Sequence, residues 1–524
     1  MTKTNLAVIW FKRDLRVFDH YPLVESSRFN QTLPIYVYEP EIINSPDYST
    51  QHLNFTNECL TELRSALEGR GSSLLIQHGE ITFILSKLLS EFGKFTLLSH
   101  EETGNLVSYK RDLKVKNWCE LNNILWKEFQ SVGIFRNLAS RDQWSKMLLN
   151  QLNLPLHSAP DFIKTPQKKI FPSGMMTSSQ LGLKESEKPF RQKGGRKKGE
   201  YFLNHFFKFH LDDYYYSMSS PITAEESCSR ISPYITFGVF SVREVYQKIK
   251  KIKNEINPSF KDSNNFRPHI SLRSFEKRLF WRCHFIQRLE SESTLESKNI
   301  HSGFDSLREP FFNDDFFEKW INSETGFPLI DASMKMLSQV GWINFRMRAL
   351  LISFSSNQLW NHWQKPAIHL AKEFLDYEPG VHYSQIQMQS GVTGMNTLRI
   401  YNPIKQAQDQ DPEGKFVKKW IPELKNIPKN FIFQPEKIPL EEQKRLGCII
   451  GKNYPNPIIN HIETAKAAKE KLWLLKNNPE IREETKKVYL KHGSRSSKKN
   501  SFTKRKIISK KKLHNPNQLK LEFD

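Results

Sequence analysis

The spacing of apolar residues along the chain changes close to residue 200, and this change limits the folds that the chain can adopt. Before that point, unbroken apolar runs (Leu6–Phe11, Leu33–Tyr38 and Ser73–Gln77) alternate with a helical pattern at Glu58–Leu67. After it, apolar residues recur at helical spacing. Unbroken strands separated by amphipathic helices are typical of a parallel sheet covered on both faces. The sequence therefore predicts an α/β domain with a parallel sheet, joined to an all-α domain.

Four segments follow from this pattern. The α/β domain is predicted to span residues 1–135 and the helical domain residues 201–480. Residues 136–200, which contain several prolines and a Gly/Lys-rich stretch, are predicted to form a mostly irregular linker. Residues 481–524 are rich in Lys, Ser and Asn, which predicts a disordered basic tail. Helices of the second domain are expected at Val239–Ile252, Phe275–Leu289, Leu329–Leu337, Phe345–Trp363 and Glu463–Leu474.

The net charge indicates a polyanionic partner. The 524 residues include 78 Lys and Arg against 56 Asp and Glu, which gives a net charge of +22. The last 40 residues, from Thr485, hold 13 basic and 2 acidic side chains, and the rest of the chain carries another +11. Because the body is basic as well as the tail, nucleic acid is the first candidate.

Neither membrane insertion nor a disulfide framework is expected. No apolar run approaches the ~20 residues that cross a bilayer, and the first residues lack an apolar signal segment. The five cysteines are odd in number and widely spaced, with no C-x-x-C pair. This pattern favours a reducing compartment and argues against a structural metal. We expect a monomeric cytoplasmic protein without a metal.

Two segments carry motifs rather than periodicity alone. Ser229–Gly238 places hydroxyls and a guanidinium before a helical stretch, which suits a phosphate but would also serve as a helix cap. A second segment, Thr325–Leu424, includes Thr-Gly-Phe-Pro-Leu-Ile-Asp-Ala-Ser-Met, Gly-Trp-Ile-Asn-Phe-Arg-Met-Arg, Asp-Tyr-Glu and Arg-Ile-Tyr-Asn-Pro. With the opening Val8–Arg16, these motifs resemble the photolyase/cryptochrome flavoprotein family in order and spacing.

The resemblance extends to about residue 430, and it implies the family's architecture and cofactor. An α/β antenna domain would be linked to a helical domain that binds FAD. A second, antenna chromophore is also implied, and the sequence leaves its identity open. The positions that match the family's FAD site are Tyr216, Ser229, Arg230, Ile231 and Ser232 in the phosphate-binding loop, with Arg282, Arg348, Asp376, Glu378 and His382 around the cofactor.

Two of these positions have competing interpretations. Asp376 stands where the family places a carboxylate facing the flavin ring, with Arg348 as its partner, and a purely structural ion pair is the alternative. His382 stands where the family usually has Asn, Asp or Cys beside flavin N5. It would either donate a hydrogen bond or a proton to the reduced flavin or, as a neutral ring, satisfy a buried carbonyl.

The family's chain of three tryptophans for photoreduction is incomplete here. Trp363 matches the middle member, whereas Ile386 and Pro310 stand at the other two positions. Each candidate for another route also fits as core packing. These candidates are Trp360, Trp342, Trp320 and Tyr383.

Several positions that would face DNA also depart from the family. Trp281 remains where the family stacks an aromatic ring against the flipped pyrimidine pair, and Arg346 and Gln406 match residues that contact the DNA backbone. Arg278 replaces a glutamate that contacts the lesion. Four further substitutions would alter the cavity: Phe345, Ala349, Met388 and, where enzymes for six-four photoproducts have histidine, Asn344.

The end of the chain suggests a protein partner. Gln518–Phe523 reads Gln-Leu-Lys-Leu-Glu-Phe and is similar to the short motif with which bacterial repair proteins dock on the replication sliding clamp. A chance amphipathic run is an equal alternative for so short a motif.

The resemblance predicts a deoxyribodipyrimidine photolyase-like carbon–carbon lyase. Light-excited, reduced FAD would pass an electron to a flipped pyrimidine dimer in damaged duplex or single-stranded DNA. Trp363 and His382 are the candidate catalytic residues. The alternative is a cryptochrome-type blue-light photoreceptor that signals through flavin redox state without repair. A third interpretation is a DNA-binding flavoprotein with little light chemistry.

Overall fold

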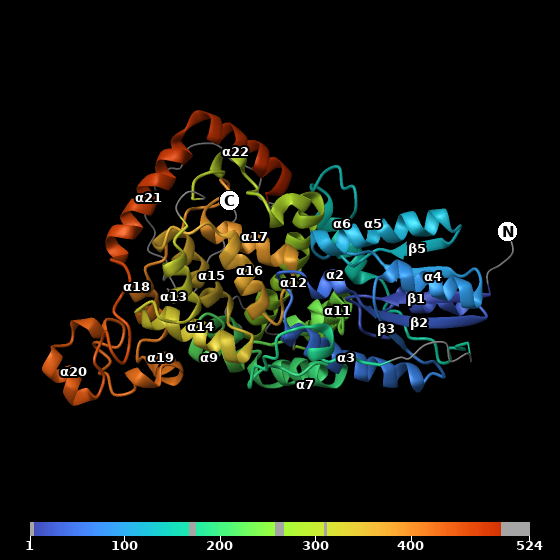
Figure 1. Cartoon of the computed structure of the whole chain (residues 1–524), viewed down its shortest axis with the longest axis horizontal. Coiled ribbons are helices and arrows are strands. Elements are labelled where there is room, and N and C mark those ends of the chain that lie inside the picture. Colours follow the sequence, from blue (N-terminus) through green and yellow to red (C-terminus); the bar gives the residue numbers. More distant parts are fainter. Residues whose placement is uncertain (1–4, 167–173, 257–266, 309–311, 494–524) are drawn as a thin grey trace.

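The computed structural model describes residues 5–166, 174–256, 267–308 and 312–493. It consists of an α/β domain, on the right in Figure 1, and a larger helical domain on the left. The predicted fold class is therefore confirmed. The motif Gln518–Phe523 and Pro310 lie outside the described residues. None of the helices within those ranges is long and apolar enough to cross a bilayer.

The α/β domain is built on a five-stranded parallel sheet of order β3-β2-β1-β4-β5. β1 lies at the centre because it pairs with both β2 and β4. The carboxyl ends of β1 and β4 thus meet where the strand order reverses, which is where such sheets usually bind ligands. The strands are β1 Leu6–Phe11, β2 Gln31–Tyr38, β3 Leu75–His78, β4 Thr96–His100 and β5 Leu125–Phe129, and the helices are α1 Tyr21–Glu25, α2 Pro40–Ile43, α3 Thr50–Glu68, α4 Ile81–Phe92 and α5 Leu106–Leu121.

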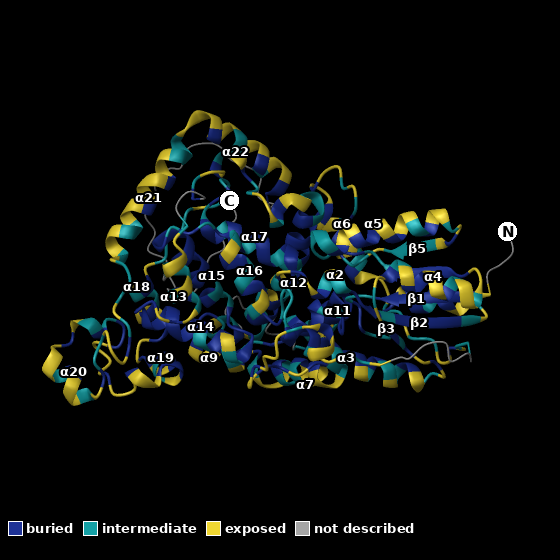
Figure 2. Ribbon diagram, viewed as in Figure 1, coloured by how far each residue is buried: buried dark blue, intermediate teal, exposed yellow. Residues whose placement is uncertain are grey.

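Both faces of β1 are buried, as its unbroken apolar sequence requires. Leu6, Val8 and Trp10 pack into a cluster with residues of α4 and α5. The alternate residues Ala7, Ile9 and Phe11 belong to a cluster that also contains side chains of the helical domain. In Figure 2 the sheet and the centre of the helical domain are mostly buried, whereas α20, α21 and α22 are largely exposed.

The helical domain contains the longest helix of the described residues, α12. Its central helix, α12, packs along α17, and the C-terminal helices α21 and α22 arch over one side of the domain (Figure 1). The bounds are α7 Arg196–His205, α8 Tyr214–Ser217, α9 Pro221–Ser227, α10 Ser232–Thr236, α11 Val242–Glu255, α12 Arg267–Ser291, α13 Asp314–Ile321, α14 Pro328–Val340, α15 Phe345–Ser353, α16 Gln364–Glu373, α17 Pro379–Ser390, α18 Pro403–Gln410, α19 Lys415–Trp420, α20 Leu440–Leu446, α21 His461–Asn477 and α22 Pro479–His492.

The element boundaries differ from the predicted ones at three places. The linker contains a helix, α6 (Trp144–Asn153), which packs against α11. The expected tail begins with most of α22, whose start is capped by Asn478 and whose Ile481 and Val488 are buried. The expected helix Phe345–Trp363 ends at Ser353 and continues as a π-helical turn to Gln358. Local periodicity missed these boundaries because burial against distant segments determines them.

The domains meet where the chain leaves β1. Leu15 donates its backbone N–H to the Phe237 carbonyl at 3.2 Å, and Arg16 Nη1 donates to the Gly238 carbonyl at 3.0 Å. Gly238 has a φ of +69°, and a Cβ there would lie 2.2 Å from the carbonyl oxygen of Arg13. Only glycine satisfies both the left-handed backbone and this close approach.

Replacing Gly238 by alanine should loosen the junction. The strained φ alone costs about 1 kcal/mol, and the clash with a neighbouring backbone adds about 1–3 kcal/mol. Gly447→Ala is the matched control, since Gly447 has a φ of +73° but nothing within 4 Å of a Cβ. Urea unfolding of both variants measures the difference in unfolding free energy. An equal loss of unfolding free energy in Gly238→Ala and Gly447→Ala would contradict the close contact between the domains.

Candidate functional site

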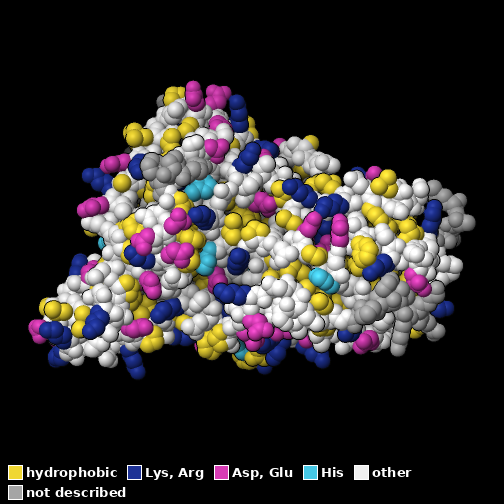
Figure 3. Space-filling model, viewed as in Figure 1, with side chains coloured by type: hydrophobic (Ala, Val, Ile, Leu, Met, Phe, Trp, Pro, Cys, Tyr) yellow, Lys and Arg dark blue, Asp and Glu magenta, His cyan; other side chains and the backbone are white. Residues whose placement is uncertain are grey.

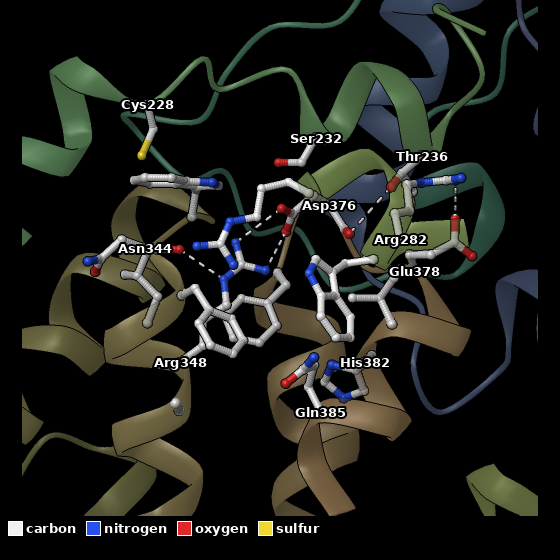
Figure 4. Close-up of a pocket in the computed structure, with 18 of the residues that line it drawn as sticks. Cys228, Ser232, Thr236, Arg282, Asn344, Arg348, Asp376, Glu378, His382 and Gln385 are labelled. Carbon is white, nitrogen blue, oxygen red and sulfur yellow. Dashed lines mark hydrogen bonds and ion pairs between the residues drawn. The ribbon is translucent and has the colours of Figure 1, made fainter. Parts of the chain in front are cut away.

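A cavity of about 330 Å³ opens in the helical domain, large enough for a cofactor-sized ligand. Its walls come from α10, α12, α15 and α17 and from the loops that precede α10, α15 and α17. The side chains drawn in Figure 4 converge on it from these elements. The residues that line the cavity are therefore spread over a long stretch of sequence, from Tyr214 to Gln389.

Arg348 and Asp376 form a two-pronged ion pair on one wall (Figure 4). The Nη1–Oδ1 and Nη2–Oδ2 distances are 2.9 and 3.1 Å. Arg348 Nε donates to the Ile343 carbonyl at 2.9 Å, which fixes the plane of the guanidinium. This geometry holds an arginine and a carboxylate in fixed places without leaving a buried charge unpaired.

Glu378 lies between two arginines from different domains. Arg282 of α12 donates to Glu378 Oε2 at 2.7 Å, and Arg13 of the α/β domain donates to the same oxygen at 2.8 Å. Glu378 is 4% exposed and directly precedes α17. The carboxylate therefore ties the junction of the domains to the helix that carries His382.

The loop before α10 lines the cavity with Ser229, Arg230, Ile231 and Ser232. Arg230 adopts a φ of +53°, and its guanidinium lies over the Trp342 ring, 4.1 Å from the centroid. Arg230 Nε donates to Gln192 Oε1 at 3.1 Å, and no carboxylate pairs with this guanidinium among the described residues. Burial lowers the pKa of Arg230. A bound anion would relieve the cost of burying this charge.

The polar atoms of the cavity fit a large anionic cofactor. Five arginines line it against two carboxylates, Asp376 and Glu378. Three buried acceptor oxygens on the wall have no hydrogen-bond partner: Asn344 Oδ1, Glu378 Oε1 and Gln385 Oε1. Excess cations suit phosphates, and acceptors without donors suit a ligand rich in N–H and hydroxyl groups. FAD offers both.

His382 points into the cavity from α17, and Gln385 follows it one turn later (Figure 4). Its Nε2 lies 2.9 Å from the Ala367 carbonyl, so this nitrogen carries the proton. Burial lowers the pKa of the ring to about 4. The geometry therefore matches the neutral-ring alternative, and it leaves Nδ1 as a hydrogen-bond acceptor.

Most of the positions expected to face DNA line the same cavity. Trp281, Arg278 and Arg346 line it, and Arg346 Nη1 donates to Gln406 Oε1 at 3.2 Å. Phe345 and Ala349 line it as well, whereas Met388 does not. Asn344 donates to the carbonyls of Met218 and Ser219 through its Nδ2.

Three expected site residues lie outside the cavity lining: Tyr216, Trp363 and Gln406. Tyr216 is 40% exposed and lies under the guanidinium of Arg267, and its neighbour Tyr214 lines the cavity instead. The two tyrosines stand two positions apart, at the ends of a run of three. Trp363 is fully buried, with its Nε1 donating to Asn299 Oδ1 at 2.7 Å. Ile386, by contrast, lines the cavity.

Other cavity residues were not predicted. Tyr377 lies between the expected Asp376 and Glu378, and Gln385 is three residues after His382, so helical spacing would have found the latter. Arg13 and Glu378 are 365 residues apart in sequence, and no local pattern predicts their contact.

A second cavity of about 340 Å³ lies at the carboxyl ends of β1, β4 and β5, next to the helical domain. At its edge, His20 Nε2 and His100 Nδ1 both donate to Asp14 Oδ2, at 2.8 and 2.7 Å, since a carboxylate can only accept. Burial opposes ionisation of Asp14, but the two rings outweigh it and hold the pKa of Asp14 well below its usual value. Arg282 and Ile235 line both cavities.

Models of known protein families match both domains. The model described as the FAD binding domain of DNA photolyase matches residues 275–474, and the DNA photolyase model matches residues 7–139. Together they cover more than half of the chain, and the first spans most of the main cavity. The chain therefore belongs to the photolyase/cryptochrome family, and its helical domain is an FAD-binding domain.

Similar proteins carry both functional names of the family. The chain is 27% identical to cryptochrome DASH of Gloeobacter violaceus, over 88% of this chain and 95% of that protein. It is 26% identical to a deoxyribodipyrimidine photo-lyase of Buchnera aphidicola, with the same coverage. A crystal structure of an archaeal photolyase from Sulfolobus tokodaii with two FAD molecules superposes with a TM-score of 0.70 at 25% identity, covering 90% of this chain and all of that one.

The neutral state of His382 predicts a pH dependence of stability. Its pKa is about 4 when folded, below the ordinary value, so the unfolded chain binds this proton more tightly between about pH 6.5 and 4. Stability therefore falls as the pH drops through this window. His382→Asn should remove about 1–3 kcal/mol of this fall.

Urea unfolding at pH 7 and at pH 5 measures the effect. His78→Asn is the control, since His78 is exposed on the α/β domain. An identical pH slope in His382→Asn and His78→Asn would contradict a buried, neutral His382.

Proposed function

We propose that this protein is a light-driven carbon–carbon lyase that repairs pyrimidine dimers in DNA. The observation that carries the proposal is the composition of the FAD-domain cavity. Beside its paired charges, the cavity is lined by the aromatic ring of Trp281 and by the cations Arg278 and Arg346. A flat apolar wall beside cations suits an extruded base pair and its phosphates.

Different residues of the cavity have different roles in this proposal. Arg230, Ser229 and Ser232 bind the phosphates of FAD, and the Arg348–Asp376 pair holds a guanidinium and a carboxylate beside its ring. His382, with Nε2–H bound to Ala367, accepts a hydrogen bond through Nδ1 but does not release a proton near neutral pH. Reduced FAD, when bound and excited by light, supplies the electron that splits the dimer.

The DNA partner follows from the charge. The chain carries +22, and Figure 3 shows Lys and Arg side chains spread over both domains. Arg346, held by Gln406, contacts the backbone next to an extruded lesion. Non-specific phosphate contacts provide affinity, and the smaller unstacking cost of a damaged base provides selectivity. Duplex and single-stranded damaged DNA both satisfy these requirements, in the reducing cytoplasm.

The second cavity is the proposed place of an antenna chromophore. It lies at the strand-order reversal of the sheet, and Arg282 and Ile235 separate it from the FAD cavity. The Sulfolobus tokodaii photolyase contains two FAD molecules. A second flavin or another aromatic pigment is the class of ligand that this position favours.

The second candidate function is a blue-light photoreceptor without repair. Arg278, Phe345 and Ala349 at the cavity favour it, because each departs from the residues expected around a lesion. The similarity to cryptochrome DASH also agrees with it.

Lesion turnover separates the two functions. The FAD-loaded protein is reduced with dithionite and illuminated with DNA that carries one cyclobutane or six-four lesion, against a dark control. We expect light-dependent loss of one lesion type. Turnover of neither lesion by a reduced, DNA-bound sample would overturn repair and favour the photoreceptor.

Trp281→Ala tests the aromatic wall in the same assay. Base–aromatic stacking contributes about 1–3 kcal/mol, so affinity for damaged DNA should fall about tenfold or more. Trp473→Ala is the control, because Trp473 is 61% exposed on α21.

A further inference from the structure

Tyr377 connects the FAD cavity to the α/β domain through its phenol. The side chain lines the cavity, and its hydroxyl donates to Asp47 Oδ2 at 2.5 Å. Asp47 is 5% exposed and belongs to the segment after α2. Asn105 Nδ2 donates to the same oxygen at 3.0 Å, and the Ser45 hydroxyl donates to the other. The carboxylate is therefore fixed beside the phenol.

Further aromatic rings continue from Tyr377 away from the cavity. The ring centroids of Tyr377 and Tyr383 are 6.4 Å apart, and those of Tyr383 and Trp363 are 6.3 Å apart. Tyr383 is 5% exposed and Trp363 is fully buried. His362, half-buried, lies 5.4 Å from Trp363. Rings in near contact provide a short path for an electron between the cavity and the outside.

The Tyr377–Asp47 contact is a favourable place to remove an electron. Burial raises the pKa of Tyr377 well above its ordinary value, so the phenol stays protonated until it is oxidised. An oxidised phenol is a very strong acid, and a carboxylate already hydrogen-bonded to it accepts the proton without rearrangement. Two other rings of the cavity differ in this respect. Trp342 and Phe374 have the guanidinium groups of Arg230 and Arg348 over their faces, which oppose a positive radical.

We propose that Tyr377, with Asp47 as its proton acceptor, supplies the electron that reduces oxidised FAD in the light; the proposal rests on the FAD-dependent light chemistry proposed above. Tyr377 gives one electron to photoexcited, oxidised flavin, its O–H bond breaks, and the proton passes to Asp47 Oδ2. Tyr383 and Trp363 then return an electron to the phenoxyl group, and Asp47 returns the proton. A thiol in solution replaces the one electron lost from Trp363 and releases its proton, and two thiols oxidised in two successive excitations join as one disulfide.

This assignment gives roles outside the repair chemistry to four residues, with Tyr383 as the link between Tyr377 and Trp363. Tyr377 is the primary donor, Asp47 positions and receives the proton, and Trp363 is the distant end of the path. It also makes the photoreduction depend on the contact between the domains, because Asp47 and Tyr377 are 330 residues apart in sequence.

Photoreduction of the oxidised, FAD-loaded protein under anaerobic blue light with a thiol tests the relay. Tyr377→Phe and Asp47→Asn should each slow it by about a hundredfold, the lower range for a positioned proton acceptor. Flash excitation of the wild type should give the spectrum of a neutral tyrosyl radical, by visible absorption and electron paramagnetic resonance. Its formation should be slower in D₂O than in H₂O.

Tyr454→Phe is the matched control, since Tyr454 also donates to a buried carboxylate, Asp331 Oδ2, at 2.5 Å but lies outside the cavity lining. Its photoreduction should equal that of the wild type. Wild-type photoreduction in Tyr377→Phe, or a wild type that is never photoreduced, would overturn the relay. Repair by the dithionite-reduced wild type is measured in parallel, and its absence would overturn the proposed function instead.

Discussion

The contact on which the site depends is the shared carboxylate of Glu378. It accepts hydrogen bonds from Arg282 within the helical domain and from Arg13 of the α/β domain. A buried carboxylate without these cations would be strongly unfavourable, so the two domains and α17 are coupled at one oxygen atom. The backbone contact at Gly238 brings the same surfaces together. Because α17 carries His382 and Ile386, the junction also determines where these side chains enter the FAD cavity.

The charge pattern of the cavity explains what it can bind. Asp376 and Glu378 are each paired with arginine, whereas Arg230 has no carboxylate partner among the described residues. The surplus of cations suits the phosphates of a dinucleotide, and the acceptor oxygens without donors suit its N–H and hydroxyl groups. The DNA-facing part of the cavity uses different chemistry, with Trp281 as an apolar wall. In the proposed function, this one cavity holds both the FAD cofactor and an extruded base pair.

Local patterns predicted the fold class correctly and the ends of several elements incorrectly. Unbroken apolar runs revealed β1, β2 and β3, but β5, an edge strand, has two charged residues in a row within Leu-Trp-Lys-Glu-Phe, and periodicity alone did not identify it. The motif positions Ser229–Ser232, Arg348 and Asp376 do meet at the cavity, because the resemblance carries three-dimensional information that spacing lacks. Asp47 escaped notice because nothing in its neighbourhood indicates a partner 330 residues away. Tyr216 was predicted at the cavity, but Tyr214, two positions earlier in the same run of tyrosines, lines it instead.

The central claim is that reduced flavin in this cavity gives an electron to a lesion in DNA. The excited-state lifetime of the reduced, FAD-loaded protein tests it most directly, measured with DNA carrying one cyclobutane or six-four lesion and with the same DNA undamaged. The account predicts a shorter lifetime with one of the damaged DNAs and no change with undamaged DNA. Equal lifetimes at saturating concentrations of all three DNAs would contradict it.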